Sequence, residues 1–257
     1  MRNACSSLQI SRLAFTDIEK AIARKSAIIV PIAGLEPFGN RGGIGSAGLC
    51  AWHLADALSA RTDTLLAPLL PYGGSYGFAA FGGISAVKRD SLARVLCELG
   101  KCWVGQGIKH LAIVDGQTSN AEFIDETAAQ LKKRNPAVTL QRLSWQSMKS
   151  VRQLVDGSAP GPEIDRKEFA LMSMTGYLDP AYLKHSADLP PEPRRPDAGA
   201  YQRWMKLGRD PQKLRKLLPD GTMLPAGVVL DIALGEKLFA AIVDILVNEF
   251  TKARSNA

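Results

Sequence analysis

Residues 27–48 read AIIVPIAGLEPFGNRGGIGSAG, a short apolar run followed by a loop rich in glycine. The apolar part, residues 27–33, is typical of a strand that is buried on both faces of a parallel sheet. After the loop, residues 49–60 (LCAWHLADALSA) repeat their apolar positions at helical spacing. The stretch therefore predicts one strand–loop–helix unit.

The same order of elements recurs along the chain. Periodicity predicts further strands at 64–69, 110–114 and 138–144, and helices at 91–107, 121–134 and 234–250. Strands that alternate with helices indicate an α/β fold with a mainly parallel sheet. We expect a three-layer α/β/α sandwich in a single domain over residues 1–257. Ligands of such sheets bind on the loops that follow the strands.

The composition is that of an ordinary globular chain, with 257 residues, 46% hydrophobic and 22% charged. No apolar run approaches the roughly 20 residues that cross a bilayer, so no membrane association is expected. The first 27 residues lack the apolar core of a secretory signal, which makes the cytoplasm the expected location. No cysteine pair has C-x-x-C spacing. Cys97 and Cys102, on a predicted helix, are expected to be buried structural thiols.

The chain is basic, with a net charge of +7 and a pI near 9.3. Much of the excess lies between Lys184 and Lys216, inside a proline-rich region, 184–226, that we interpret as a solvated excursion. An anionic substrate or partner is the second interpretation. Nucleic acid ranks third and is not expected, because no recognised binding motif accompanies the charge.

Three loops that follow predicted strands carry glycine, hydroxyl and amide groups, and short motifs accompany them. The motifs are PIAGLEPFGNRGGIGSA (31–47), PLLPYGGS (68–75), FGGIS (81–85), GIKHLAIVDGQTSN (107–120), GYLDPAYL (176–183) and GVVLDIALGEKL (227–238). In this order and spacing they resemble the creatininase (creatinine amidohydrolase) family. The resemblance covers most of the chain and implies the creatininase-like α/β/α sandwich, an amidohydrolase-type activity and a homo-oligomer.

The resemblance also implies a two-metal centre, which this sequence does not reproduce. Glu36 matches the first glutamate ligand of the family. The other ligand positions hold residues that are poor metal ligands: Phe38, Arg41, Ala47, Gln117, Ser119 and Leu171. One carboxylate cannot hold two divalent ions, and Arg41 adds a fixed positive charge. We therefore expect neither a catalytic metal nor another cofactor.

Glu36 remains the candidate catalytic residue. Burial beside Phe38 would raise its pKa and suit it to general acid or base catalysis. The candidate substrate-binding residues stand on the same three loops: Asn40, Arg41, Tyr72, Ser75, Asp115, Gln117, Ser119 and Asn120. Two structural alternatives stay open. Asn120 is more simply a helix N-cap, and the glycines around Arg41 either cradle an anion or only preserve the path of the loop.

Three functions follow from this set. The first is a metal-independent enzyme on a small polar or anionic molecule, with C–N chemistry (amide or imine, ring opening or closing) implied by the resemblance. The second is a pseudoenzyme that binds or scaffolds, and the third is a surviving metal-dependent amidohydrolase. An enzyme should keep an open pocket at Glu36, whereas a pseudoenzyme should fill that space with Phe38 and Leu171. Chelators should inactivate the third.

Overall fold

The computed structural model describes residues 7–157, 165–184, 210–225 and 227–255. Its sheet has five parallel strands in the order β1-β3-β2-β4-β5. The strands are β1 (Leu8–Gln9), β2 (Ala27–Ile32), β3 (Leu65–Leu66), β4 (His110–Asp115) and β5 (Thr139–Leu143). The predicted parallel α/β architecture is confirmed.

Alternate residues of the central strands enter two separate cores. On β2, Ile29 packs into one hydrophobic cluster, while Ile28 and Val30 pack into the other. On β4, Ala112 and Ile113 divide in the same way. Both strands are fully buried, which is why each contains an unbroken apolar run, 27–32 in β2 and 111–114 in β4.

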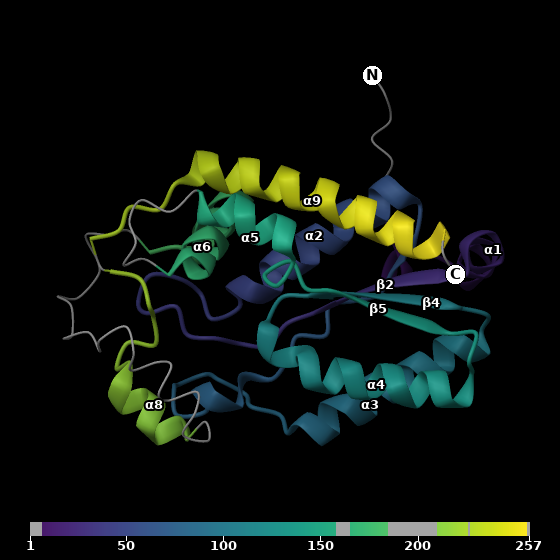
Figure 1. Cartoon of the computed structure of the whole chain (residues 1–257), viewed down its shortest axis with the longest axis horizontal. Helices are drawn as coiled ribbons and strands as arrows, with labels where there is room; N and C mark the ends of the chain where they lie inside the picture. The colour runs from purple at the N-terminus through teal and green to yellow at the C-terminus, as the bar shows by residue number, and fades with distance from the viewer. Residues whose placement is uncertain (1–6, 158–164, 185–209, 226, 256–257) are drawn as a thin grey trace.

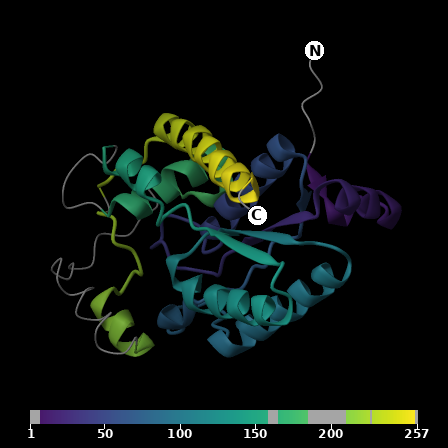
Figure 2. The ribbon, with the colours of Figure 1, turned by 45° about the vertical axis from the view of Figure 1, so that its right-hand side comes forward.

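Helices cover both faces of the sheet, as Figure 1 shows and Figure 2 confirms from a second angle. One face carries α2 (Ser46–Thr62), α5 (Lys149–Asp156), α6 (Arg166–Leu178) and α9 (Ile232–Ser255). The other carries α3 (Arg89–Gly105) and α4 (Ala121–Arg134), with α1 (Phe15–Lys25) packed into the same cluster at the β1–β3 edge. The three-layer sandwich is therefore as predicted.

The strand predicted at 64–69 is much shorter than expected, because only Leu65 and Leu66 pair as β3. Pro68 has no backbone N–H and interrupts the ladder. The chain returns to the sheet at Leu70, whose N–H donates to the Pro31 carbonyl at 3.0 Å. Proline thus ends the regular strand without separating the chain from the sheet.

The cysteines on α3 differ from expectation. Cys97 is buried, but Cys102 is exposed. An α-helix has about 3.6 residues per turn, so side chains five positions apart point about 140° away from each other around the helix axis. The two thiols therefore cannot lie on one face. The predicted burial of Cys102 is wrong for this reason.

Part of the predicted excursion is a packed helix. Residues 185–209 and 226 lie outside the described residues, but α8 (Pro211–Leu217) begins at Asp210, whose carboxylate accepts from the N–H groups of Gln212 and Lys213. Leu214 and Leu218 are buried against Phe81. The described portion of this region is therefore anchored to the 78–84 loop rather than free in solvent.

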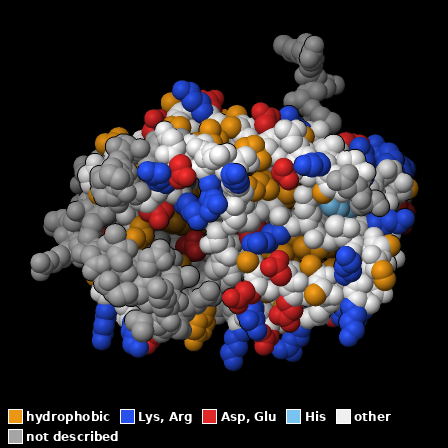
Figure 3. All heavy atoms as spheres, viewed as in Figure 1, with side chains coloured by type: hydrophobic (Ala, Val, Ile, Leu, Met, Phe, Trp, Pro, Cys, Tyr) orange, Lys and Arg blue, Asp and Glu red, His pale blue; other side chains and the backbone are white. Residues whose placement is uncertain are grey.

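No helix in the described part of the chain is long and apolar enough to cross a membrane. On the face seen in Figure 3, basic and acidic side chains are interspersed among the described residues. That distribution differs from the single basic stripe that marks a nucleic-acid surface.

Candidate functional site

The three glycine-rich loops converge on the side chain of Gln117. Its amide oxygen accepts from the Gly34 N–H, and its amide nitrogen donates to Ser75 Oγ at 3.2 Å. The backbones are so close that a Cβ on Gly73 would lie 2.5 Å from Gln117 Oε1. Glycine is needed at this crossing because any side chain would separate the loops.

The side chains of Asp115 and Asn120 also hold these loops together. Asp115 ends β4 fully buried, and its Oδ1 accepts from the Gln117 N–H at 3.0 Å and from Asn120 Nδ2 at 2.9 Å. Asn120 Oδ1 accepts from the Gly74 N–H at 2.8 Å. Asn120 occupies the N-cap position of α4, as predicted, but its side chain makes no capping hydrogen bond to the helix. Its amide instead bridges two loops.

The remaining polar candidates lie apart from this network. Asn40 and Tyr72 are exposed. The Ser119 hydroxyl is buried and has no hydrogen-bond partner among the described residues. Arg41 is buried, and its guanidinium donates to the backbone carbonyls of Val228 and of Pro225, the latter at 2.6 Å.

Arg41 thus ties the segment 225–228 to the 34–48 loop, and removing it should destabilise the fold. We expect Arg41→Met to lower the free energy of unfolding by about 2–3 kcal/mol, because two carbonyls lose charged donors. Urea denaturation followed by circular dichroism measures the change. Arg94→Met, an exposed position on α3, is the control and should stay within about 0.5 kcal/mol. Equal effects of the two variants would show that the Arg41 contacts are energetically unimportant.

A pocket of about 360 Å³ lies beside Glu36, at the end of the sheet where α6 and α8 stand in Figure 1. Among the described residues its walls are Glu36, Pro37, Phe38, Phe78, Thr118, Gln146, Asp165, Lys167, Glu168, Leu171, Leu218, Gly221 and Met223. Of the candidates expected from sequence, Glu36 alone is in this set. Phe38 and Leu171 line the pocket and leave it open.

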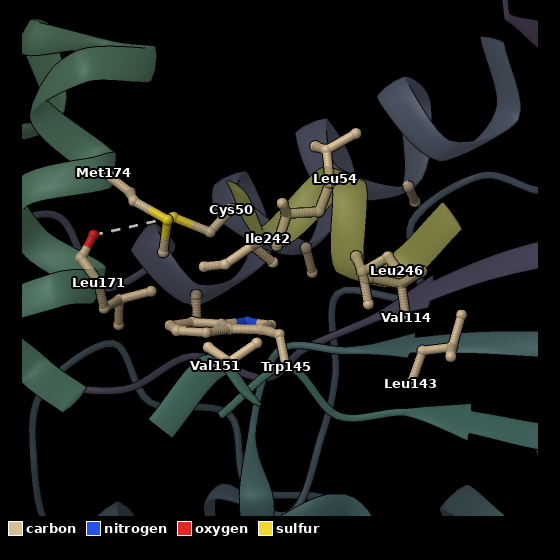
Figure 4. Packing of buried hydrophobic residues seen from close by; sticks show 14 of the residues in the cluster. Cys50, Leu54, Val114, Leu143, Trp145, Val151, Leu171, Met174, Ile242 and Leu246 are labelled. Atoms are coloured by element: carbon tan, nitrogen blue, oxygen red, sulfur yellow. Dashed lines mark hydrogen bonds between the residues drawn. The ribbon is translucent and has the colours of Figure 1, made fainter. Parts of the chain in front are cut away.

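The pocket is continuous with the main core through Leu171. Figure 4 shows Leu171 beside Trp145 and Val151, and its carbonyl lies 3.8 Å from Cys50 Sγ, the pair joined there by a dashed line. All four residues are buried in one cluster. Helix α6, which carries Glu168, is therefore rigidly packed against α2 and α5.

Two carboxyl groups in the pocket have raised pKa values. Burial raises the pKa of Glu36 to about 7, assisted by the charge of Asp115 and opposed by a hydrogen bond from Gln117. Burial raises the pKa of Glu168 to about 8, opposed by hydrogen bonds from the Thr222 hydroxyl and the Met223 N–H at 2.8 Å. Glu36 itself contributes to the raised pKa of Glu168. Near neutral pH the pair can offer one base and one acid.

Sequence reasoning missed Glu168. The pattern Asp165-x-x-Glu168 is that of a helix capping box, in which the glutamate folds back on the N-cap. Asp165 does cap α6 by accepting from the Glu168 N–H at 2.9 Å. The carboxyl group of Glu168, however, reaches Thr222 and Met223, more than 50 positions away in sequence. Local sequence holds no signal for that contact.

The described residues do not fit a two-metal centre. No group of three or more histidine, cysteine, aspartate or glutamate side chains among them could hold a metal ion. At the positions that the resemblance assigns to metal ligands, Ala47 is a buried methyl group at the start of α2, and both ends of the Gln117 amide are occupied by other loops. Phe38 and Leu171 present only carbon to the pocket.

The raised carboxyl pKa values give stability a definite pH dependence. A glutamate ionises near pH 4.5 in the unfolded chain, so the contribution of Glu36 and Glu168 is complete below that pH and is lost as pH rises through about 7 and 8. Asp115, with a pKa raised to about 6, acts in the same direction. One pKa unit corresponds to about 1.4 kcal/mol, so we expect the free energy of unfolding to fall by several kcal/mol between about pH 5.5 and 8.5. Glu168→Gln should flatten this decline, and an unchanged slope in urea titrations would contradict it.

The chain is similar to proteins of one family along most of its length. The family model described as "Creatininase: Creatinine amidohydrolase" matches residues 11–250. A crystal structure of creatininase aligns over 96% of this chain and 98% of its own, at 17% identity and a TM-score of 0.74. A structure described as "Creatininase Mn" gives 18% identity, the same coverage and a TM-score of 0.75. A putative creatinine amidohydrolase from Bacteroides fragilis covers 95% of both chains at 16% identity and a TM-score of 0.69. No curated protein matches the sequence. At these identities the structural likeness shows the fold alone.

Proposed function

We propose that this chain, which belongs to the creatininase family, is an amidohydrolase-like enzyme that works without metal and acts on a C–N bond of a small polar molecule. The observation that carries the proposal is the open pocket in which Glu36 and Glu168 stand together. Clefts that collect carboxyl groups with raised pKa values are preferred sites of acid–base chemistry. Family membership makes the C–N bond the natural target, and the carboxyl pair supplies a chemistry that needs no metal.

The two glutamates differ in pKa, and this difference assigns them different catalytic roles. Glu36 has the lower pKa, about 7, and serves as the base that takes a proton from water. Glu168, with a pKa of about 8, is protonated at neutral pH and gives its proton to the departing nitrogen. Water oxygen bonds to the substrate carbon, the C–N bond breaks, and the proton lost by Glu168 is balanced by the one gained by Glu36.

A hydrogen-bond network beside the pocket keeps Glu36, the proposed base, in place. Gln117 contacts Glu36 by a hydrogen bond and is itself held by Gly34 and Ser75. Asp115 fixes the backbone of Gln117. We therefore assign Asp115, Gln117 and Asn120 a positioning role instead of the substrate contacts expected from sequence.

An inactive binding protein is the alternative, and it requires the pocket to be closed or its carboxyl groups to be dispensable. Phe38 and Leu171 belong to the wall and do not occlude the space, which favours the enzyme. The homo-oligomer and the cytoplasmic location implied by the resemblance and by composition remain predictions.

A substrate panel tests the function. The full chain is incubated with lactams, cyclic imides, cyclic amidines and formamides, and mass spectrometry follows water addition or amine release. Each reaction is run on protein dialysed against a chelator, and on the same protein with zinc or manganese restored, after elemental analysis. Turnover that survives chelation and is lost in Glu36→Gln supports the proposal. Turnover that requires added metal would restore the metal-dependent hydrolase, and no turnover on any class would favour the binding protein.

A further inference from the structure

We propose that the pocket beside Glu36 and Glu168 takes a molecule with an apolar body and a positively charged nitrogen head, such as an amidinium or ammonium group. This inference names the substrate class of the site and rests on the function proposed above. It replaces the anionic ligand that the basic composition suggested.

The charged walls of the pocket are predominantly acidic. Glu36, Asp165 and Glu168 contribute carboxyl groups, and Lys167 is the one cationic side chain among the described lining residues. Lys167 is exposed, so its ammonium group can remain in water. An anion in this pocket would meet carboxyl groups, whereas a nitrogen cation would meet acceptors.

Arg41, the natural anion-binding group of the 34–48 loop, is directed elsewhere. Its guanidinium donates to the carbonyls of Pro225 and Val228 and is absent from the described pocket wall. Among the described residues, Lys167 is therefore the whole contribution of lysine and arginine to the pocket wall. Local wall chemistry, rather than net charge, decides which ligand is favoured.

Much of the rest of the described wall is apolar and suits a hydrocarbon body. Its apolar side chains are Pro37, Phe38, Phe78, Leu171, Leu218 and Met223, and Thr118 and Gln146 add uncharged polar groups. A volume of about 360 Å³ lies within the range of small-molecule sites, which combine mostly apolar walls with a few polar groups that orient the ligand. A ligand with both an apolar body and a donor head would satisfy both kinds of wall.

The carboxyl group of Glu168 has room for such a head. One oxygen accepts from the Thr222 hydroxyl and the other from the Met223 N–H. A cation beside Glu168 favours the ionised form of its carboxyl group, so the proton held by the free enzyme is released when the cation binds. The carboxylate then offers about four lone-pair sites, so acceptor capacity remains for the ligand. The contacts to Thr222 and Met223 fix the direction of the group, which reduces the entropy lost on binding.

Three probes of one shape and different charge test the inference: benzamidine (cation), benzamide (neutral) and benzoate (anion). Calorimetric titration of the full chain at about pH 7.5 should give benzamidine at least tenfold tighter binding than benzoate, with benzamide between them. Glu168→Gln should weaken benzamidine about tenfold and leave benzamide unchanged. Glu19→Gln, the same substitution at an exposed position of α1, should bind like the unmodified chain.

Benzoate that binds as tightly as benzamidine, or no measurable binding of benzamidine at millimolar concentration, would overturn the inference. These results are separate from the proposed function, which is judged by turnover. A benzamidine preference with turnover intact in Glu36→Gln would refute the acid–base mechanism alone. A benzoate preference with turnover abolished in Glu36→Gln would refute the cationic substrate class alone.

Discussion

Replacing Glu168 by glutamine is expected to reduce turnover by about 10²–10⁴-fold, the range that a single general acid or base contributes. Glutamine has nearly the same shape and keeps an oxygen that can accept from Met223 N–H. It cannot release a proton to the departing nitrogen, however. The rate constant kcat should therefore fall much more than the affinity for substrate changes. The measurement is steady-state kinetics on the best substrate of the panel.

The pH profile separates this role from a purely structural one. With both glutamates present, the rate should fall below about pH 7 as Glu36 becomes protonated and above about pH 8 as Glu168 ionises. Because the two groups interact, these limits belong to the pair and are apparent values. In Glu168→Gln the decline at high pH should disappear from the residual activity.

Glu19→Gln provides the matched control, since it makes the same chemical change at an exposed position on α1. It should leave both rate and profile unaltered. If Glu168→Gln retained full turnover with an unchanged alkaline limb, Glu168 would not be the acid, and the metal-independent mechanism would lose its second proton-transfer group. Circular dichroism and urea denaturation would verify that each variant is folded.

The sheet was readable from sequence because burial on both faces leaves an unmistakable pattern. β2 is an uninterrupted apolar run of six residues, and β4 contains a run of four, residues 111–114. α4 begins and ends where its periodicity does, at 121 and 134. The two-residue strands β1 and β3 were missed or overextended. Their pairing depends on neighbours distant in sequence and on Pro68, so hydrophobicity alone could not set their limits.

The site could be predicted only in part, because its contacts also join residues that are distant in sequence. Glu36 stands on the loop that follows the buried strand β2, and its carboxyl group contacts Gln117, on which the three loops converge. Hydroxyl and amide residues on those loops were expected to face a ligand. Instead, the side chains of Ser75, Gln117 and Asn120 form hydrogen bonds within the loops, to other side chains and to glycine N–H groups. Composition cannot distinguish a polar group that binds a ligand from one that joins two loops.

A methyl group added at Gly235 should destabilise the protein by roughly 3 kcal/mol or more, the largest stability effect that we expect from so small a change. Gly235 lies in the first turn of α9, where the helix crosses α6. A Cβ there would stand 2.1 Å from the Ser173 carbonyl oxygen and 2.9 Å from the Met174 nitrogen. These are backbone atoms inside α6, so no side-chain rotation can relieve the overlap.

The substitution therefore forces two packed helices apart, and the cost is one of overpacking rather than of helix propensity. Propensity alone would favour Gly235→Ala by about 0.5–1 kcal/mol, since glycine weakens a helix interior. Gly105→Ala isolates that opposite effect, because a Cβ at the end of α3 meets nothing within 4 Å. Urea denaturation of both variants should show a lower midpoint for Gly235→Ala and an equal or higher midpoint for Gly105→Ala. A shift in the same direction and of the same size for both would mean that α6 and α9 do not make this close backbone contact, and that α6, which carries Glu168, is less firmly fixed than the proposed mechanism requires.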